Sequence, residues 1–440
     1  MGLLQSTIYN PQSTIHNPQS MYNTPMQIII PSDVFPPTGK GGAAWSSHAL
    51  ALALIERGHW VTAVVPSHDR PGVRAHDALG VPTLYVGYRA PRLPIIQNYF
   101  RHERLWHPLA DAIVATAAGR PAVIHAQHVQ TAPAAVIAGH RIGMPVVVTV
   151  RDHWPWDYFA TGLHGDHTPH PQASWASLAT DLPARLGPLR GSLAIAAIPY
   201  MLAHLRRRAA FLSHADAVIA CSTYIAGRLA GIVAPERLHV LPHMVDIAAT
   251  ERIVATPAQT QVDGPLLLFA GKLEPNKGAG LLPAIFRELR NLEVSPFTLV
   301  VAGDGALRDP LERQLAELGV NVRFLAWADH SEVLRLMARC DLLLFPSAWG
   351  EPLSRVLLEA ASLGTPILAM PTGGTPDIIT DGVNGALAAT PRAFAARMRD
   401  LLEHPAEARR LGAAARTFAL VRYDIPAVIT RYEDLYTSLT

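Results

Sequence analysis

Two glutamates near the C-terminal end of the chain are spaced so that both could serve one ligand. Glu351 lies in a Pro/Ser/Gly turn after the apolar run Leu342–Phe345, and Glu359 follows in the helix expected over 353–363. In a βαβ unit the ligand sits at the carboxyl end of the strand, where the free amides and dipole of the next helix favour an anion. Two carboxylates there suit a phosphate that carries hydroxyl-rich groups, because each glutamate accepts hydrogen bonds from hydroxyls.

Two lysines supply the opposite charge. Lys272 and Lys277 flank a turn directly after the apolar run Leu266–Ala270, which is expected to be a strand of the same sheet. Both lysines should face the same crevice as the helix start expected at 353–356. Two cations beside the free amides of a helix suit a diphosphate. Cations, amides and two carboxylates together are what a nucleoside diphosphate sugar requires. Such groups can stabilise a leaving diphosphate without a metal ion.

The N-terminal part must position the other side of such a ligand. An apolar run at 26–30, a glycine-rich loop and a helical pattern over 43–57 precede a second strand. Gly39, Gly41 and Gly42 do not have the dinucleotide-binding spacing, and no acidic residue ends the second strand, so a nicotinamide cofactor is disfavoured. The Gly41-Gly42 pair is either a flexible turn or a point where the backbone approaches a ligand at the helix start.

Further strand-like runs alternate with helical patterns, which predicts a parallel, doubly wound α/β sheet. Two polar loops at strand ends, 125–130 and 151–157, should open on the same face as the Gly41-Gly42 loop. The strand-like runs are Thr83–Val86, Ala122–His125, Val146–Val150, Ala217–Ala220 and Leu238–Leu241.

Composition excludes several classes of function. The chain has 440 residues with 49% hydrophobic and 16% charged, enough for two domains with large cores. A formal charge of +2 gives no long-range attraction for nucleic acid. The 20 histidines are scattered and no His/Cys group has metal spacing, so no metal and no cofactor are expected. Cys221 and Cys340 are interpreted as buried free thiols of a reducing compartment.

The pattern predicts five segments. Residues 1–25 form an imperfect polar repeat, interpreted as a disordered tail or an upstream start-codon artefact. An N-terminal α/β domain spans 26–246, and a Thr/Gln/Pro-rich linker spans 247–263. A second α/β domain spans 264–413, and the helical segment 414–440 is expected to pack back across the domain junction.

An insertion lies between the 151–157 loop and the strand that starts at Ala217. Its apolar centre, Gly191–Ala203, is flanked by Arg190 and by three arginines at 206–208. It is too short to span a bilayer, and no run of 18 apolar residues occurs elsewhere in the chain. Two interpretations stay open: an interfacial helix at an anionic membrane, or a core helix with a basic end.

Several of these stretches together resemble a known family. FAGKLEPNKG, VVAGDG, FPSAWGEPLSRVLLEAASLGTPILA, GGTPDIITDGVNG and the N-terminal GGAAWSSHALALALIERGHWVTAVV are similar to the family 4 retaining nucleotide-sugar glycosyltransferases. The most specific element is the Glu-seven residues-Glu spacing of Glu351 and Glu359. The resemblance implies an α/β GT-B architecture: two Rossmann-like, doubly wound parallel-sheet domains facing a cleft, with the nucleotide held mainly by the C-terminal one.

The resemblance also implies roles for residues of the C-terminal half. Lys277 matches the phosphate-binding lysine, whereas Lys272 stands where the family usually has arginine and so keeps the charge without the bidentate fork. Glu351 would bind sugar hydroxyls near the reacting carbon, and Glu359 would accept the ribose hydroxyls. The other donor-binding positions are the backbone amides of Leu353, Ser354, Arg355 and Val356, for the distal phosphate, and the Trp327 segment, for the base.

In the N-terminal half the resemblance is weaker. The family often has His-x-His after the strand that ends at 124, but this chain reads His125-Ala126-Gln127-His128. The second histidine is therefore replaced by Gln127 or shifted to His128, and we assign the contact with the donor sugar to His128. The expected catalytic residues are thus Glu351, His128 and Lys277. Gly42 would approach the donor phosphates, and Asp152 and His153 would face the acceptor.

The leading hypothesis is a metal-independent retaining glycosyltransferase that moves a hexose from a nucleoside diphosphate sugar to an acceptor hydroxyl. The acceptor would be a cell-surface glycan, a lipid-linked glycan or a small molecule. The expected location is cytoplasmic, with peripheral contact at the inner face of the membrane left open. Two alternatives are a GT-B nucleotide-sugar epimerase, which needs no acceptor, and a non-catalytic protein that binds nucleotide sugars.

Overall fold

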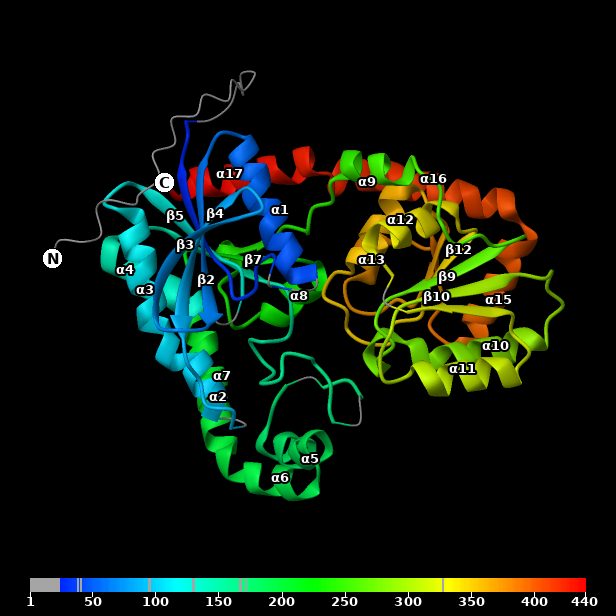
Figure 1. Ribbon diagram of the computed structural model, residues 1–440, viewed down its shortest axis with the longest axis horizontal. Helices are drawn as coiled ribbons and strands as arrows, with labels where there is room; N and C mark the ends of the chain where they lie inside the picture. Colours follow the sequence, from blue (N-terminus) through cyan, green and yellow to red (C-terminus); the bar gives the residue numbers. More distant parts are fainter. Residues whose placement is uncertain are drawn as a thin grey trace.

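The computed structural model describes residues 24–37, 39, 42–93, 96–128, 131–165, 168–170, 172–326 and 328–440. Within them the chain forms two α/β bodies that lie side by side, with the N-terminal body mainly in blue to green and the C-terminal body in green and yellow to orange-red (Figure 1). Nearly all of the predicted N-terminal tail lies outside the described residues.

The N-terminal sheet has strand order β3-β4-β2-β1-β5-β6-β7-β8, and every pairing in it is parallel except that of β3 with β4. Every residue of the apolar strands β5 and β6 is buried, because helices cover both faces of a doubly wound sheet. The strands are β1 (Gln27–Pro31), β2 (Trp60–His68), β3 (Gly72–Ala78), β4 (Val81–Tyr88), β5 (Ala122–Ala126), β6 (Val146–Val150), β7 (Ala217–Ala220) and β8 (Leu238–Val240). The helices are α1 (Gly42–Glu56), α2 (Ile96–Arg101), α3 (Glu103–Ala117), α4 (Ala132–Ile142), α5 (Trp175–Leu186), α6 (Pro188–Ala194), α7 (Ile198–Ser213) and α8 (Thr223–Leu229).

The C-terminal sheet has strand order β11-β10-β9-β12-β13-β14 and is parallel in each pairing. Its strands are β9 (Leu266–Ala270), β10 (Thr298–Ala302), β11 (Val322–Leu325), β12 (Leu342–Phe345), β13 (Ile367–Ala369) and β14 (Ala386–Leu387). Its helices are α9 (Ile247–Val254), α10 (Leu282–Arg290), α11 (Arg308–Glu317), α12 (His330–Arg339), α13 (Arg355–Leu363), α14 (Thr375–Ile378), α15 (Pro391–Glu403) and α16 (Pro405–Arg422).

The prediction of two doubly wound parallel-sheet domains is confirmed, and two strands, β3 and the two-residue β14, were missed. Strand β3 pairs antiparallel with β4 at the edge of the first sheet, and all but the last of its residues are exposed. A solvated edge strand carries little apolar periodicity, so the sequence pattern gave no signal for it.

The predicted linker at 247–263 is only partly irregular. Its first half is helix α9, which is capped by the Asp246 carboxylate and packs on α12 and α13 of the C-terminal domain. The segment that crosses between the domains is therefore the short stretch between β8 and α9. The Thr/Gln/Pro-rich second half, 255–265, is the irregular connection into β9.

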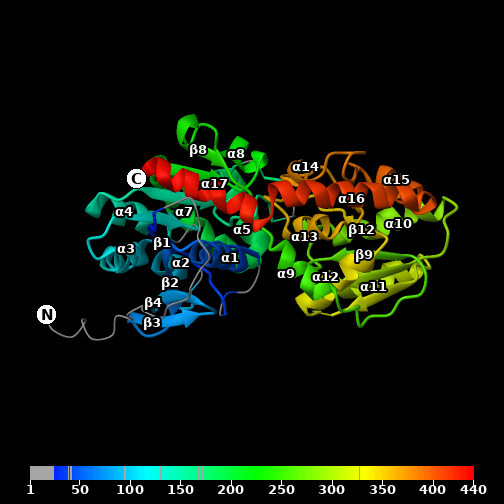
Figure 2. The same cartoon turned by 90° about the horizontal axis from the view of Figure 1, so that it is seen from above.

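The end of the chain crosses back to the N-terminal domain, as predicted. Helix α16 lies on the C-terminal domain, and α17 (Ile425–Leu439) continues over the N-terminal domain (Figure 2). The crossing occurs at Asp424, which pairs with Val245 where the chain first crosses. Helix α17 buries Val428, Ile429 and Tyr436 in the core under β1 and β2.

The structure bears out the core-helix interpretation for the second part of the insertion's apolar centre, and contact with a membrane stays a prediction. Helix α7 is a core helix: Met201 and Leu212 are fully buried, and Arg208 is buried with its guanidinium on the Trp154 carbonyl at 3.1 Å. The preceding helix α6 instead leaves Leu189 and Leu193 about three-quarters exposed. Among the described residues, no helix is both long and apolar enough to cross a membrane.

Candidate active site

The polar residues singled out from the sequence gather where the carboxyl ends of parallel strands from both domains meet. His128 follows β5, Asp152 and His153 follow β6, Lys277 follows β9 and Glu351 follows β12. Loops at this end of a parallel sheet are the place where doubly wound folds bind ligands.

Lys277 and Glu351 form a direct ion pair. The Nζ atom of Lys277 lies 2.6 Å from Oε2 of Glu351 and 4.8 Å from the centre of the Trp349 ring. Lys277 ends a short 3-10 turn (Pro275–Lys277), and Gly278 follows at a φ of +76°, where a Cβ would lie 1.9 Å from the Pro346 carbonyl oxygen. Only glycine fits that turn, and it brings the loop after β9 against the loop after β12.

Glu359 is almost fully buried on α13 and is held by two cationic groups. His330 Nε2 lies 3.1 Å and Arg355 Nη2 lies 3.2 Å from the same carboxylate oxygen, Oε1. Burial would raise the pKa of Glu359, but the hydrogen bond from His330 and the Arg355 charge outweigh it and lower the pKa. The hydrogen bond to Glu359 in turn raises the pKa of His330. Glu359 is therefore a carboxylate, able to accept hydrogen bonds from hydroxyls.

The helix that carries Glu359 begins later than predicted. Ser354 is its N-cap, with the hydroxyl accepting from the Leu357 amide at 3.4 Å, and Arg355 is the first helical residue. The predicted start at Leu353 was early because a serine cap keeps extended backbone angles. The amides of Leu353 to Val356 still surround the helix start, where an anion is favoured.

Gly42 lies opposite this helix start, as the first residue of α1. A Cβ on Gly42 would lie 2.9 Å from Cδ of Arg355, so a larger residue would collide with that side chain. The Arg355 guanidinium then reaches Ser46 of α1 at 3.3 Å. Arg355 thus spans the two domains at the position where the sequence predicted bound phosphates.

His128 sits between two aspartates. Its Nδ1 lies 2.7 Å from Asp33 and its Nε2 lies 2.5 Å from Asp152. Burial would lower the pKa of His128, but the two carboxylates outweigh it and raise the pKa to about 10. His128 is therefore an imidazolium at neutral pH. Asp33, which follows β1, was missed by sequence reasoning; its place after a buried strand was the available signal.

The neighbouring residues of the His125–His128 loop have other roles. His125 is fully buried and bonds the hydroxyls of Tyr436 and Thr149 at 2.6 and 2.7 Å, so it ties the sheet to α17. Burial and the Arg151 charge lower its pKa to about 3. The Gln127 side chain accepts a hydrogen bond from Arg151 and is itself buried. Of the two residues weighed for the sugar contact, Gln127 is buried, whereas the His128 side chain is 18% exposed.

His153 is buried at the domain junction. Its Nε2 lies 3.0 Å from the Gly350 carbonyl of the C-terminal domain, while its Nδ1 accepts from the Trp156 indole at 3.2 Å. Burial lowers the pKa of His153 despite the favourable carbonyl contact. The neutral ring therefore carries its proton on Nε2 and donates it to Gly350. Trp349 makes a parallel link, because its indole donates to the Thr161 carbonyl of the N-terminal domain.

Of two further predicted donor residues, one lies apart from this group and the other is not among the described residues. The Lys272 side chain is 58% exposed, and its ion partner in the structure is Glu274 at 3.9 Å. Trp327 lies outside the described residues. Their predicted roles in holding the diphosphate and the base stay predictions.

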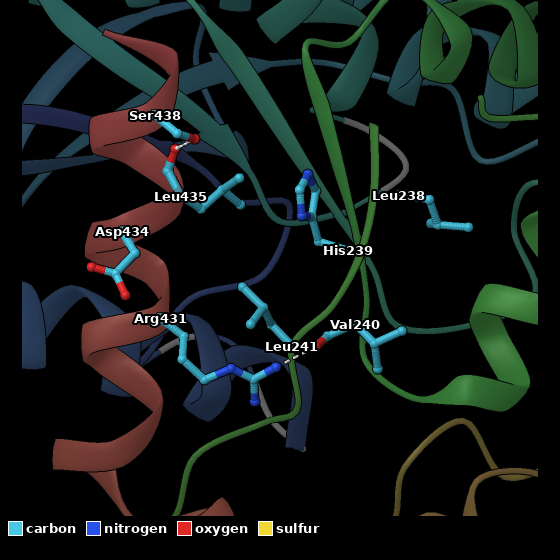
Figure 3. Close-up of a pocket in the computed structure, with 8 residues that line it drawn as sticks. All are labelled: Leu238, His239, Val240, Leu241, Arg431, Asp434, Leu435 and Ser438. Atoms are coloured by element: carbon cyan, nitrogen blue, oxygen red, sulfur yellow. Dashed lines mark hydrogen bonds between the residues drawn. The ribbon is translucent and has the colours of Figure 1, made fainter. Parts of the chain in front are cut away.

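An open hollow of about 500 Å³ lies elsewhere, between β8 and α17 (Figure 3). Arg431 donates to the Val240 carbonyl across it at 2.8 Å. Leu238, Leu241 and Leu435 also line it, and none of the acidic or basic residues of the domain junction does. We therefore place the candidate site at the junction.

Comparison with family models identifies two segments of the chain. Residues 40–249 match the model described as Glycosyltransferase Family 4, and residues 256–418 match the model described as Glycosyl transferases group 1. The chain belongs to the family 4 type of glycosyltransferases. The two matches correspond to the two α/β domains, so each half of the junction comes from one matched segment.

Relatives of this glycosyltransferase include full-length and partial matches. Glycogen synthase of Mycobacterium tuberculosis is 26% identical over 93% of this chain and 94% of its own. A GDP-mannose-dependent phosphatidylinositol monomannoside mannosyltransferase of Mycolicibacterium smegmatis is 30% identical over 47% of this chain and 58% of its own.

Solved structures show that the glycosyltransferase has the GT-B fold. HepE of Anabaena in complex with UDP is 20% identical with a TM-score of 0.65, covering 94% of this chain and 100% of that one. Sucrose-phosphate synthase of Thermosynechococcus elongatus is 21% identical with a TM-score of 0.65, covering 94% and 99%. The predicted GT-B architecture and the transfer of a glycosyl group from a nucleotide sugar are confirmed.

Proposed function

We propose that this glycosyltransferase moves a hexose from a nucleoside diphosphate sugar to an acceptor hydroxyl with retention of the anomeric configuration and without a metal ion in the reaction. The observation that carries the proposal is the Lys277–Glu351 pair. In this pair a cation lies 2.6 Å from a carboxylate, next to a helix start that favours anions. Lys277 would neutralise the leaving diphosphate while Glu351 accepts hydroxyls of the transferred sugar.

The remaining residues have supporting roles in this proposal. Glu359 would accept the ribose hydroxyls, exchanging its bonds with Arg355 and His330 for bonds with the donor. The released Arg355 guanidinium and the amides of the helix start would then face the phosphates. His128 would give up its contact with Asp152 and donate that N–H to the sugar, while Asp33 continues to hold the ring protonated. The side of the junction that carries Asp152 and His153 would take the acceptor.

Relatives support a nucleotide-sugar donor but differ in its identity. HepE was solved with UDP, with UDP and glucose and with UDP-glucose, whereas the mycobacterial mannosyltransferase is GDP-mannose-dependent. The acceptor would be a glycan, a lipid-linked glycan or a small molecule, and net charge gives no support for nucleic acid. No resident cofactor is proposed.

A donor screen followed by a product assay tests the proposal. UDP- and GDP-sugars are first ranked by thermal shift, and the best donor is incubated with glycan and lipid-linked acceptors, with no metal added and again with EDTA. We expect release of nucleoside diphosphate that depends on the acceptor, and NMR of the product should show the anomer of the donor. Interconversion of the donor without acceptor would identify an epimerase, and binding without any turnover would identify a binding protein. An inverted anomer would contradict retention.

We also propose peripheral contact with the inner face of the cytoplasmic membrane through the insertion. Helix α6 exposes Leu189 and Leu193 beside Arg190, and Trp175 of the adjoining α5 is 52% exposed. Apolar side chains beside arginine suit an anionic lipid surface. Co-sedimentation with anionic vesicles should fall in a Leu189→Ser, Leu193→Ser variant; equal recovery with and without vesicles for the native chain would remove this part of the proposal.

A further inference from the structure

Three potential metal ligands meet in the insertion, outside the residues of the domain junction. His164, His170 and Asp181 each offer one ligand atom, and these atoms all lie within 4.8 Å of one another. Nδ1 of His164 lies 3.2 Å from one oxygen of Asp181, and Nε2 of His170 lies 4.0 Å from the other. The two imidazole rings are 4.6 Å apart between centres.

The backbone holds the two histidines together. Leu163 pairs with Pro169 in an antiparallel bridge, the His164 amide donates to the Thr168 carbonyl at 2.9 Å and the His170 amide donates to the Gly162 carbonyl at 2.8 Å. Helix α5 supplies the third group from the other side, since Asp181 accepts from the Gly165 amide at 2.9 Å. Both histidines therefore come from one loop that an isolated bridge holds in place, and the carboxylate comes from a helix.

His170 is the independent sign that a ligand belongs here. Its side chain is 1% exposed, yet neither ring nitrogen has a hydrogen-bond partner among the described residues. A buried imidazole without a partner is costly, and buried polar groups in native proteins are almost always satisfied. Nε2 of His170 lies too far from the Asp181 carboxylate for a direct hydrogen bond. A metal ion bound between them would give Nε2 a partner.

The donor set and spacing favour zinc. Zinc binds imidazole nitrogen and carboxylate oxygen at about 2.0 to 2.2 Å, which places tetrahedral ligand atoms about 3.3 Å apart. The ligand atoms lie 3.2 and 4.0 Å apart in the two histidine–aspartate contacts and within 4.8 Å overall, so zinc would draw His170 closer to the other two groups. Magnesium and calcium prefer oxygen ligands alone. The nearby Arg185 donates to the carbonyls of Leu163 and His164, so its hydrogen bonds leave the Asp181 carboxylate available.

The same segment contacts the candidate active site. Gly162 packs on His153 so closely that a Cβ would lie 2.4 Å from its Nδ1. The carbonyl of the preceding Thr161 accepts from the Trp349 indole, whose ring lies under Lys277. An ion at His164 and His170 would fix the position of these two residues from the other end of the segment.

We propose that His164, His170 and Asp181 bind a structural zinc ion that holds the insertion against the domain junction. The zinc takes no part in the glycosyl transfer, because its ligands lie on the insertion and not among the residues around Lys277 and Glu351. The fourth coordination position is open to water on the side of His164, the most exposed of the three ligands.

Zinc content measures the site directly. The full-length chain, without a histidine tag, is incubated with zinc, desalted and analysed by mass spectrometry for metals. We expect one zinc ion per chain in the native protein and loss of it in a His164→Ala, Asp181→Asn double variant. The matched control is His404→Ala, Asp400→Asn, which removes an exposed histidine–aspartate pair at 3.3 Å on α15 and should keep the zinc. If the native chain retains no more zinc than the double variant, the proposal is wrong.

Two further measurements keep the test decisive if the double variant folds poorly. Zinc added to the metal-free native chain should raise the thermal midpoint by roughly 5 °C at saturating concentration. It should also slow hydrogen exchange at the amides of Gly165 and His170, and the control variant should respond equally. If zinc changes neither the thermal midpoint nor the hydrogen exchange of the native chain, the proposed site is wrong whatever the variants show.

Discussion

Lys277 and Glu351 meet at 2.6 Å from loops that follow two neighbouring strands, β9 and β12, of the C-terminal sheet. Each charge compensates the other before a donor arrives, so neither waits in the site as an unpaired buried ion. Binding of a diphosphate and a sugar would divide the pair, with Lys277 moving to the phosphates and Glu351 to the hydroxyls. The pairing explains how opposite charges can belong to one donor site.

The first prediction concerns this pair. Lys277→Gln and Glu351→Gln should each lower kcat/KM by about 100-fold, because each removes a charge that acts on the developing transition state. Since the two residues act as a unit, the double variant should lose much less than the product of the two single losses. Steady-state kinetics on the three variants measures the coupling. Glu312→Gln and Arg313→Gln, on the exposed face of α11, are charge controls. Strictly multiplicative losses would show that the two residues do not cooperate.

The second prediction concerns Glu359. If it accepts the ribose hydroxyls, the native enzyme should bind the 2′,3′-dideoxy form of its nucleoside diphosphate about tenfold or more weakly than the parent. Glu359→Gln should bind the parent weakly and discriminate little between the two ligands. Calorimetry on both proteins with both nucleotides completes the cycle. Equal discrimination by native and variant enzymes would move the ribose contact to another residue.

The third prediction is a pH dependence of stability from His128. Its folded pKa of about 10 lies above that of an unfolded histidine, so the folded state holds a proton that the unfolded state has lost. The stabilisation is fully present below about pH 6.5 and is lost as the pH rises toward 10, with a slope of at most about 1.4 kcal/mol per pH unit. Denaturant unfolding at several pH values should show a shallower slope for Asp33→Asn. Identical slopes would mean that Asp33 does not hold the proton.

The sequence was informative wherever a function depends on local order. Apolar runs predicted the central strands, and Glu351 and Lys277 stand in loops whose position follows from those strands. Contacts between residues that are far apart in the sequence could not be predicted from local patterns. Asp33 flanks His128 although 95 residues separate them, and Arg355 reaches Ser46 across the domains. No metal site was predicted because no His/Cys group has the spacing of a short metal-binding motif. His170 and Asp181 are far apart in the sequence and are brought together by a turn and a helix.

The fourth prediction concerns the domain junction. His153→Ala removes the donor to the Gly350 carbonyl and the acceptor of the Trp156 indole, so it should loosen the contact between the domains while leaving each fold intact. Small-angle X-ray scattering should give a larger radius of gyration, and KM for the donor should rise more than kcat falls. A variant with native dimensions and native KM would show that the contact does not hold the domains together.

The fifth prediction concerns Glu433 of α17. It is buried and accepts hydrogen bonds from Arg57, at 2.7 Å, and contacts His59 at 3.0 Å. Glu433→Gln should destabilise the N-terminal domain by about 2 to 4 kcal/mol, because two partners lose a charged acceptor. Thermal unfolding monitored by circular dichroism measures the loss. Thr430→Ala on the exposed face of the same helix is the control, and equal midpoints for the two variants would contradict the role of Glu433.

The return of α17 to the first domain has a consequence for how the protein is made. Tyr436 completes the hydrogen bonds of His125, and Val428 and Ile429 complete the core beneath β1 and β2. On the ribosome, residues 26–246 therefore emerge long before the last piece of their own interior is translated. The C-terminal domain is translated before α17, so the interior of the N-terminal domain is completed only after the whole C-terminal domain has been made.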